Sequence, residues 1–369
     1  MRKAYNYRIS PTRGQQHILT TMLEECRFVY NQTLTARREA WEQRQESLGL
    51  YDTQSLLPAW KADRPSLKRV HSQVLQNVQV RVDLAFKAFF RRVKAGESDV
   101  GYPRFKGFGR YDSLTYPQYG NGVRLQGNTL ILSKIGSVNV ILHRPVEGPI
   151  KTVTIRRAAT GKWYASLSVE TSPRPLAPDK SAVGVDVGLA SFATLSNGEK
   201  IANPRFFRVK EKELAKVQRK LSKAEKGTPE RTKRRKIVGR VHERIANCRS
   251  NFAHQEGRKL VNRFGILAFE DVNTNGMLTN HCLAKSIADA AWNQFVLVTT
   301  SKAEEAGRRV VLVDPRNTSK RCSRCGQLVE KDLSVRVHSC PVCGLVLDRD
   351  ENAAINILAL GLQCLGASP

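Results

Sequence analysis

The chain has 369 residues, and its 61 Lys and Arg outnumber its 33 Asp and Glu to give a formal net charge of +28. A chain of this length can bury large cores and can contain two or three domains, and so large a positive excess indicates a polyanionic partner. No stretch approaches the ~20 apolar residues of a membrane span, and neither end carries a basic amphipathic anchor, so we expect no membrane partner. Residues 1–9 lack the apolar core of a signal peptide, so we expect a reducing cytoplasm. With a polyanion as the partner, we expect no small-molecule substrate.

The N-terminal region combines a strand with a helical lobe. Residues 1–10 are predicted as the strand, and residues 11–100 as helices that open after Thr12 and after Pro65. Spacings of three and four residues define the expected core faces: Ile18, Met22, Cys26, Val29 and Tyr30, then Leu67, Val70, Val74, Val78, Val82, Phe86 and Phe89. Three polar residues lie off the second face and are available to a ligand: Ser72, Gln73 and Gln76.

Between residues 99 and 121 aromatic and basic residues alternate in a background of glycine and proline. The residues that carry the pattern are Tyr102, Arg104, Phe105, Lys106, Phe108, Arg110 and Tyr111. Such a loop suits single-stranded or irregular nucleic acid, because rings stack on bases and cations contact phosphates. The alternative is a basic loop whose aromatic side chains pack beneath the domain.

Residues 122–171 alternate apolar and polar side chains between turn signals, which predicts antiparallel strands. We expect them to form a small barrel over residues 101–171, joined by the strand of residues 1–10, with the helical lobe inserted between. The proline-rich stretch 172–180 is then the linker into the next domain.

Acidic residues interrupt or end apolar stretches at three places in the C-terminal half. Asp186 lies inside Val183–Leu195, which otherwise reads as one buried strand, and Glu270 ends the apolar run that starts at Gly265. A third cluster, containing Asp348 and Asp350, opens a helical pattern. A buried carboxylate needs a cation, and the glycines beside Asp186 leave room for a ligand or another backbone. The alternatives are a solvent-facing Asp186 and simple helix capping by Asp348 and Glu351.

The order of the predicted elements indicates how these acids meet. The predicted elements follow the order of an RNase H-like fold. A strand with Asp and a hairpin through residues 196–198 come first, then helices and a strand with Glu, and finally a helix, a strand and a last helix with Asp. Three acids at one edge of such a sheet would hold two divalent ions about 3.5–4 Å apart for phosphodiester hydrolysis, and hard oxygen ligands favour magnesium or manganese. The acid order Asp, Glu, Asp resembles the RuvC branch of this fold more than the Asp, Asp, Glu order of transposase and integrase cores.

Residues 206–264 are predicted as helices broken near Gly227, with a dense basic run. Its members include Arg231, Lys233, Arg234, Arg235 and Arg240. Charge runs are usually solvated surfaces. This one has a single sign and lies between two predicted metal ligands, so we expect a nucleic-acid duplex along these helices, held through its phosphates.

Four cysteines form two CxxC knuckles, each followed by glycine: Cys322 and Cys325, then Cys340 and Cys343. Four thiolates at this spacing suit one structural, tetrahedral Zn²⁺, and disulfides are the alternative that a reducing compartment disfavours. His338 could substitute as a ligand. The other cysteines have no partner spacing and are expected to be buried small residues: Cys26, Cys248, Cys282 and Cys364.

Several motifs in this order resemble the TnpB family of transposon-encoded, RNA-guided nucleases, which is akin to the smallest type V CRISPR effectors. The motifs are GVDVGL at 184, 186 and 188, FED at 269–271, the two knuckles, DRDENAAIN from residue 348, CRFVYN from residue 26 and YPRFK from residue 102. The resemblance runs from residue 2 to about residue 360. It implies an α/β RuvC domain with a zinc-ribbon insertion, preceded by a wedge barrel that carries a helical recognition lobe.

The resemblance also implies domain boundaries and site residues. The RuvC domain would comprise residues 181–317 and 347–361, with the zinc ribbon at 318–346 and a tail at 362–369. Asp186, Glu270 and Asp350 would be the metal-binding triad, with Asp348 as the substitute for Asp350. Four residues would lie where the recognition lobe meets the target-adjacent motif: Tyr51, Ser72, Gln73 and Gln76.

The function that these features imply is RNA-guided cleavage of double-stranded DNA with two Mg²⁺ ions or Mn²⁺. The guide RNA would come from the transposon right end, and the protein would act in a prokaryotic cytoplasm, at the nucleoid when bound to DNA. Two other functions remain open. One is a nuclease-silent, RNA-guided DNA-binding repressor, which should lack part of the triad, and the other is a protein-only transposase, which needs no RNA.

Overall fold

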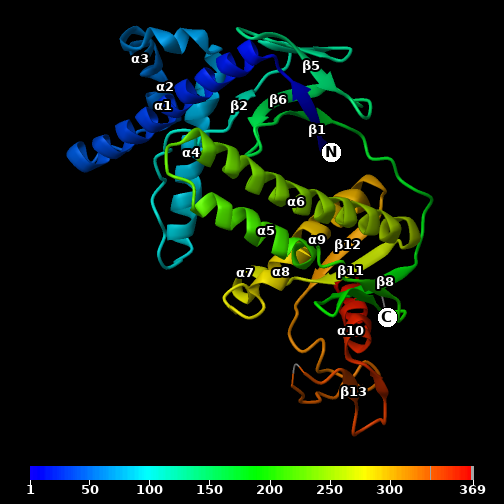
Figure 1. The fold of residues 1–369 in the computed structure, drawn as a ribbon. Helices are drawn as coiled ribbons and strands as arrows, with labels where there is room; N and C mark the ends of the chain where they lie inside the picture. The colour runs from blue at the N-terminus through cyan, green and yellow to red at the C-terminus, as the bar shows by residue number, and fades with distance from the viewer. Residues whose placement is uncertain (333, 367–369) are drawn as a thin grey trace. The chain divides into compact units, whose positions relative to one another are not determined.

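The computed structural model describes residues 1–332 and 334–366 (Figure 1). The chain divides into two compact units, one comprising Met1–Thr171 and the other starting at Ser172. Each unit has its own sheet and its own buried core. Within the described residues, no helix is long and apolar enough to cross a membrane.

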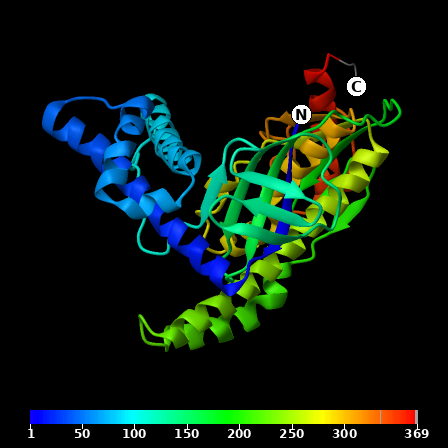
Figure 2. The same cartoon turned by 90° about the horizontal axis from the view of Figure 1, so that it is seen from above.

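The first unit is built on a seven-stranded antiparallel sheet (Figure 2). Its strands are β1 (Arg2–Ser10), β2 (Ser113–Tyr116), β3 (Val123–Gln126), β4 (Thr129–Leu132), β5 (Gly136–Ile141), β6 (Ile150–Arg157) and β7 (Trp163–Glu170). Their order is β2-β6-β7-β1-β5-β4-β3. The N-terminal strand therefore lies in the middle of the sheet, between strands from much later in the chain. Every second side chain of β1 is buried, namely Tyr5, Tyr7 and Ile9, because alternate residues point to opposite faces.

All helices of the first unit lie between β1 and β2 in the chain. They are α1 (Arg13–Arg44), α2 (Leu50–Ser55), α3 (Leu57–Asp63), the 3-10 turn η1 (Pro65–Arg69) and α4 (Ser72–Lys94). Thr12 and Gln15 form a capping box at the start of α1. The predicted core faces are buried at most positions. The prediction that Ile18 is buried is wrong, because this side chain is 38% exposed and its neighbour Leu19 is buried instead.

Helices α1 and α4 are also joined by a buried ion pair. Arg37 donates to Asp83 Oδ1 at 2.8 Å, and both side chains are at most one-tenth exposed. Lys87 contacts the second oxygen of the same carboxylate at 2.9 Å. Because a buried charge that loses its partner is strongly destabilising, this cluster fixes how the two helices pack.

The second unit contains a five-stranded sheet in the order β10-β9-β8-β11-β12. The strands are β8 (Ala182–Val187), β9 (Ser191–Leu195), β10 (Lys200–Ala202), β11 (Ile266–Glu270) and β12 (Arg309–Val313). β8, β11 and β12 are parallel, whereas β9 and β10 complete an antiparallel meander with β8. The prediction of one strand over Val183–Leu195 is therefore wrong: the chain turns after Gly188 and returns as β9.

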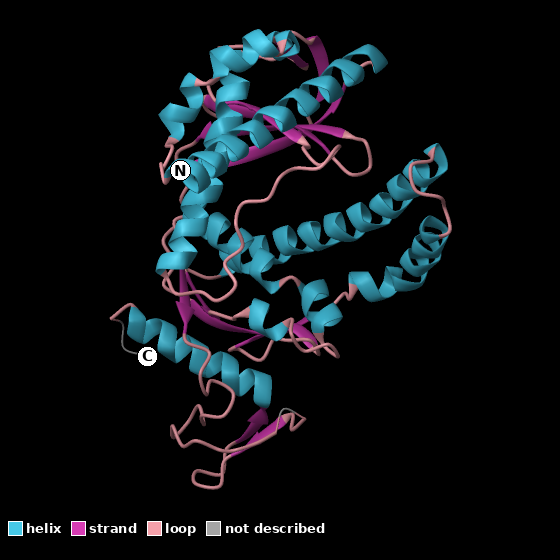
Figure 3. Ribbon diagram, turned by 90° about the vertical axis from the view of Figure 1, so that its left-hand side faces the viewer, coloured by secondary structure: helices cyan, strands magenta, loops and turns pink. Residues whose placement is uncertain are grey.

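Helices cover both faces of this sheet (Figure 3). They are α5 (Phe206–Ser222), α6 (Pro229–Arg263), α7 (Thr274–Met277), α8 (Ala284–Ala290), α9 (Trp292–Glu305) and α10 (Arg349–Cys364). Leu267 and Phe269 of β11 share a core with α6 and α9, and Ala268 between them faces Ile357 of α10. The three-residue strands β13 (Val337–Ser339) and β14 (Val346–Asp348) form a small ribbon at the N-terminal end of α10. Of the tail predicted at 362–369, residues 367–369 lie outside the described residues.

Candidate metal centre and cysteine cluster

Three carboxylates from distant parts of the chain converge beside β8 and β11. The two strands are parallel neighbours, with Val185 opposite Phe269, so Asp186 and Glu270 follow at the same level of the sheet. The pKa of Asp186 is raised well above its usual range, first because protein atoms enclose the carboxylate and then because Glu270, Asp350 and Asp348 add negative charge. Among the described residues, no hydrogen bond or ion pair to this carboxylate is found.

Glycines allow α10 to bring the third acid to this edge. A Cβ on Gly184 would lie 2.0 Å from the carbonyl oxygen of Ala354, and a Cβ on Gly361 would lie 2.6 Å from the Cβ of Ala268. Because neither glycine carries a side chain, the helix packs directly on the strands. Gly184 therefore leaves room for another backbone, one of the two uses predicted from its place beside Asp186.

The two aspartates at the start of α10 have different surroundings. Asp348 accepts hydrogen bonds from the N–H groups of Asp350 and Glu351, at 2.9 and 3.2 Å, and its other oxygen lies 2.7 Å from Lys200 Nζ. Asp348 is therefore the N-cap of the helix, which confirms for this residue the alternative prediction of helix capping. Asp350 lies further into the first turn and accepts from the Arg349 guanidinium at 2.9 Å, with Arg336 3.7 Å from its second oxygen.

Among the residues that the structure describes, one hydroxyl bonds to Glu270. Thr318 donates a short hydrogen bond to Glu270 Oε1, while burial raises the pKa of the glutamate and this bond opposes the rise. Three crowded carboxylates with only peripheral cations are a donor set that fits hard divalent ions. In the conformation described, the three are not close enough to share one ion. Among the described residues, only the four cysteines have ligand atoms close enough together to hold one metal ion.

The four knuckle cysteines place their sulfur atoms within 4.8 Å of one another. The closest pairs are Cys322 with Cys343 at 3.5 Å and Cys325 with Cys340 at 3.6 Å. The backbone N–H of Cys343 and then that of Val342 lower the pKa of the Cys340 thiol to about 6, although burial opposes them. Four converging sulfurs, with backbone donors that favour a thiolate, fit one Zn²⁺.

The other cysteines correct a prediction. Cys26 is buried as expected, and burial raises the pKa of its thiol to about 12. Cys248, Cys282 and Cys364 are exposed, so they are not the small core residues that the sequence indicated. His338 is fully buried, and its Nδ1 contacts Lys331 Nζ.

The polar residues predicted on the recognition lobe lie at the starts of α2 and α4. Tyr51 is 83% exposed, and Ser72 and Gln76 are exposed as well. Gln73 is half-buried and donates to Gln118 at 3.1 Å, while Ser72 accepts from Lys61 at 3.0 Å. All four side chains are polar groups at helix starts, and three of them are accessible.

Both interpretations of the aromatic loop apply, to different residues. Tyr102 packs edge-on against Phe86 and Phe89, and Tyr111 is buried. The backbone of Lys106 is fixed by Asn31, which both donates to it and accepts from it at about 3 Å. The exposed side chains of the predicted loop set are Tyr102, which packs with one edge only, Arg104, Phe105, Phe108 and Arg110.

The basic residues of α6 also divide into two groups. Arg231 donates to the carbonyl oxygens of Leu221 and Ala224 at the end of α5, at 3.1 and 2.5 Å, so its guanidinium holds the turn between the helices. Arg234 pairs with Glu230 at 2.6 Å. The exposed cations of the predicted set are Lys233, Arg235 and Arg240.

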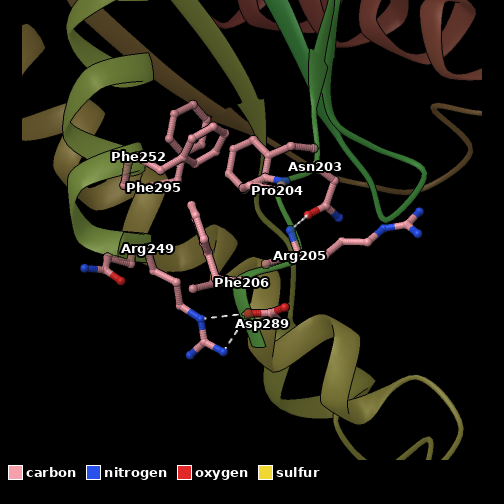
Figure 4. A pocket seen from close by; sticks show the side chains of 13 residues that line it. Asn203, Pro204, Arg205, Phe206, Arg249, Phe252, Asp289 and Phe295 are labelled. Atoms are coloured by element: carbon pink, nitrogen blue, oxygen red, sulfur yellow. Dashed lines mark hydrogen bonds and ion pairs between the residues drawn. The ribbon is translucent and has the colours of Figure 1, made fainter. Parts of the chain in front are cut away.

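A separate pocket lies where α5 begins, between α6 and α9 (Figure 4). Asp289, almost fully buried, accepts from the backbone N–H of Phe207 at 2.8 Å and from Arg249 Nη2 at 2.7 Å. The rings of Phe206, Phe252 and Phe295 line the rest. Asp289 therefore caps α5 from a neighbouring element, and the pocket is a packing junction separate from the acidic edge.

Sequence reasoning missed the residues that hold the two centres together, namely Thr318, Asn352, Asn356, Arg349 and Lys200. The two asparagines are buried, lie four residues apart in the DRDENAAIN stretch and bond to the segment before the first knuckle. Buried amides one helical turn apart were the only available signal for them. Nothing local marks Thr318 or Lys200, because both act through contacts with distant parts of the chain.

Comparisons with known proteins match nearly the whole chain. Residues 166–281 match the family described as "Probable transposase" (OrfB_IS605), residues 1–46 match its "Helix-turn-helix domain", and residues 292–357 match "Cas12f1-like, TNB domain". A "Putative RNA-guided DNA endonuclease" of Streptomyces pristinaespiralis is 36% identical, with 98% of this chain and 90% of that protein covered. "Putative RNA-guided DNA endonuclease InsQ" of Escherichia coli (strain K12) is 31% identical, with 97% and 92% covered. The solved Cas12f1-sgRNA-target DNA complex shares the fold, with a TM-score of 0.60 at 15% identity, covering 94% of this chain and 83% of that one.

Proposed function

Because the chain belongs to the OrfB (TnpB) family of RNA-guided DNA endonucleases, we propose that it cleaves double-stranded DNA at a site chosen by a bound guide RNA. The observation that carries the proposal is that Asp186, Glu270 and Asp350 lie at one edge of the second sheet, near enough for the other two charges to raise the pKa of Asp186, although not near enough in this conformation to share one ion. This edge lies at the carboxyl ends of two parallel strands, and the sheet order and flanking helices support an RNase H-like, RuvC-type domain. We propose residues 181–317 and 347–361 for that domain, with the zinc ribbon at 318–346.

In this proposal the three acids would hold two Mg²⁺ ions, or Mn²⁺, which supply an activated water and stabilise the leaving oxygen of the phosphodiester. The residues of the chain prepare the site. Thr318 orients Glu270, and Asp348 caps α10 so that Asp350 stays at the edge of the sheet. Arg349 and Arg336 balance the charge of Asp350, and the more exposed of the two, Arg336, would be available to a phosphate.

The first unit would bind the nucleic acids. We propose residues 1–10 and 101–171 as the wedge and residues 11–100 as the recognition lobe, with 172–180 as the linker. Tyr51, Ser72, Gln73 and Gln76 would contact DNA beside the target. The exposed loop residues would contact unpaired nucleotides: Arg104, Phe105, Arg110 and, in part, Tyr102 and Lys106.

The guide RNA would come from the right end of the transposon, and the protein would work in a prokaryotic cytoplasm, at the nucleoid when bound to DNA. Base pairing between RNA and target would supply the sequence specificity, and the protein would supply phosphate contacts and one hydrolytic centre. The cysteine cluster would hold one structural Zn²⁺.

The test is plasmid cleavage by protein purified with and without the transcript of the transposon right end. We expect cleavage that needs both the RNA and Mg²⁺, and none from Asp186→Asn, with Asp63→Asn at the exposed end of α3 as the matched surface control. RNA-dependent DNA binding without cleavage by the native chain would identify a silent repressor. Cleavage or strand transfer without RNA would identify a protein-only transposase.

A further inference from the structure

A continuous set of hydrogen bonds connects the cysteine cluster to the acidic site. Thr318 lies four residues before Cys322 and is only 4% exposed. Its hydroxyl reaches Glu270 Oε1, with the carbonyl oxygen of Pro315 next nearest at 3.1 Å. One hydroxyl has one proton, and the carboxylate is the closer and more strongly accepting partner.

The backbone of the same segment is fixed to α10. Asn356 Nδ2 donates to the carbonyl oxygens of Thr318 and Arg321, each at 2.7 Å, and Asn352 Nδ2 donates to Arg321 at 2.8 Å. Asn352 Oδ1 in turn accepts from the backbone N–H of Ser323, inside the first knuckle, at 2.9 Å. Asn352 is fully buried and lies two residues after Asp350.

These contacts constrain both acids through one short stretch, residues 318–323. At one end it orients Glu270, along its length it is bonded to the helix that carries Asp350, and at its other end it enters the cysteine cluster. A ribbon with two three-residue strands has little core of its own, so a metal held by the four cysteines would be what orders it.

On the basis of the function proposed above, we propose that Thr318 is a positioning residue through which the zinc-loaded cysteine cluster sets the geometry of the Mg²⁺ site. Zinc would then be part of the nuclease centre, because loss of the ribbon's order releases Thr318 and allows Glu270 to rotate. Hydrogen-bond partners that orient a metal ligand in this way typically affect metal affinity by about 10–100-fold.

The experiment compares Thr318→Val, which replaces the hydroxyl by a methyl group, with Thr318→Ser, which keeps the hydroxyl. Thr299→Val is the matched control, since Thr299 is also buried but its hydroxyl has no partner among the described residues. Mn²⁺ binding by the complex with RNA and a non-cleavable target is measured by electron paramagnetic resonance, together with zinc content, melting temperature and RNA affinity. We expect Thr318→Val to weaken Mn²⁺ binding at least tenfold with one zinc retained, and Thr318→Ser and Thr299→Val to bind as the native protein does.

The coupling is tested by removing zinc. Cys325→Ser should weaken Mn²⁺ binding in the native background, but by much less when combined with Thr318→Val, because the connection is already broken. If Thr318→Val does not fold, Thr318→Ala removes the hydroxyl without adding bulk and carries the same expectation. Native Mn²⁺ affinity in Thr318→Val, equal losses in the Ser and Val variants, or additive effects in the double variant would each overturn the proposal. The proposed function fails by a different result, which is cleavage by Asp186→Asn or no cleavage by the native complex.

Discussion

The backbone of Ala354 lies so close to Gly184 that a Cβ at position 184 would meet the Ala354 carbonyl oxygen at 2.0 Å and the Leu358 nitrogen at 2.7 Å. Both atoms belong to the backbone of α10, which cannot move aside as a flexible side chain can. Asp186 follows Gly184 by two residues, and Asp350 precedes Ala354 by one helical turn. The same close approach that packs the helix on the strand therefore sets the spacing of two of the three acids.

Gly184→Ala is accordingly expected to damage both stability and cleavage. Overpacking of this kind costs about 1–3 kcal/mol or more, and any relief moves α10 away from β8 and Asp350 away from Asp186. The measurements are chemical denaturation and plasmid cleavage. Gly14→Ala is the control, because a Cβ there meets nothing within 4 Å and alanine favours the helix. A Gly184→Ala protein with native stability and activity would show that α10 tolerates displacement.

The sequence predicted which acids and which cysteines lie near one another better than it predicted the residues around them. Asp186, Glu270 and the four cysteines stood out because an acid in an apolar run and a repeated CxxC spacing are local patterns. The turn after Gly188 was missed because Leu189 and the residues of β9 continue the apolar run, so composition alone did not separate two strands. Ile18 and Leu19 are both apolar, and periodicity could not decide which of them faces the core.

What could not be predicted depends on contacts between distant segments. Its basic neighbours place Arg231 among the predicted phosphate-binding cations. Its guanidinium instead donates to backbone carbonyl oxygens at the end of α5. The exposure of the other cysteines was equally unpredictable: Cys282 lies in the turn between α7 and α8, and Cys364 is the last residue of α10. Thr318 could not be predicted because its partner, Glu270 at the end of β11, lies 48 residues away in the chain.

The raised pKa of Asp186 gives the metal-free protein a defined pH dependence. An acid that binds its proton more tightly in the folded state contributes most stability below its ordinary pKa of about 3.9, and this contribution is lost as pH rises through the raised value. In EDTA we therefore expect the free energy of unfolding of the native protein to fall, relative to that of Asp186→Asn, as pH rises above about 4; Asp83 and Asp348, whose pKa values are lowered, act in the opposite direction in both proteins. Asp186→Asn should lack this fall and be more stable than the native protein at neutral pH, because the amide carries no charge into the enclosed site. Denaturation at several pH values measures both, and parallel curves for the two proteins would refute the assignment.

The division of the α6 cations predicts two kinds of variant. Alanine at Lys233, Arg235 or Arg240 should weaken RNA or DNA binding and reduce the slope of log affinity against log salt by about 0.9 for each phosphate that the protein no longer neutralises. Arg231→Ala should leave that slope nearly unchanged and lower the melting temperature instead, because it uncaps α5. Salt titrations of binding, with thermal melts of the same proteins, separate the two effects. A slope change for Arg231→Ala equal to that of its neighbours would place its side chain on the phosphates.

Asp348 and Asp350 can be distinguished by the same conservative change. Asparagine is as good an N-cap as aspartate, so Asp348→Asn should keep α10 intact, remove only the ion pair with Lys200 and retain cleavage within about tenfold. Asp350→Asn removes a carboxylate from the converging group and should abolish cleavage while leaving RNA and target binding intact. Cleavage rates and binding affinities of both variants are compared, with Lys200→Met as the control for removal of the ion pair. If Asp348→Asn is inactive and Asp350→Asn cleaves, Asp348 is the third metal ligand and its capping bonds give way when metal binds.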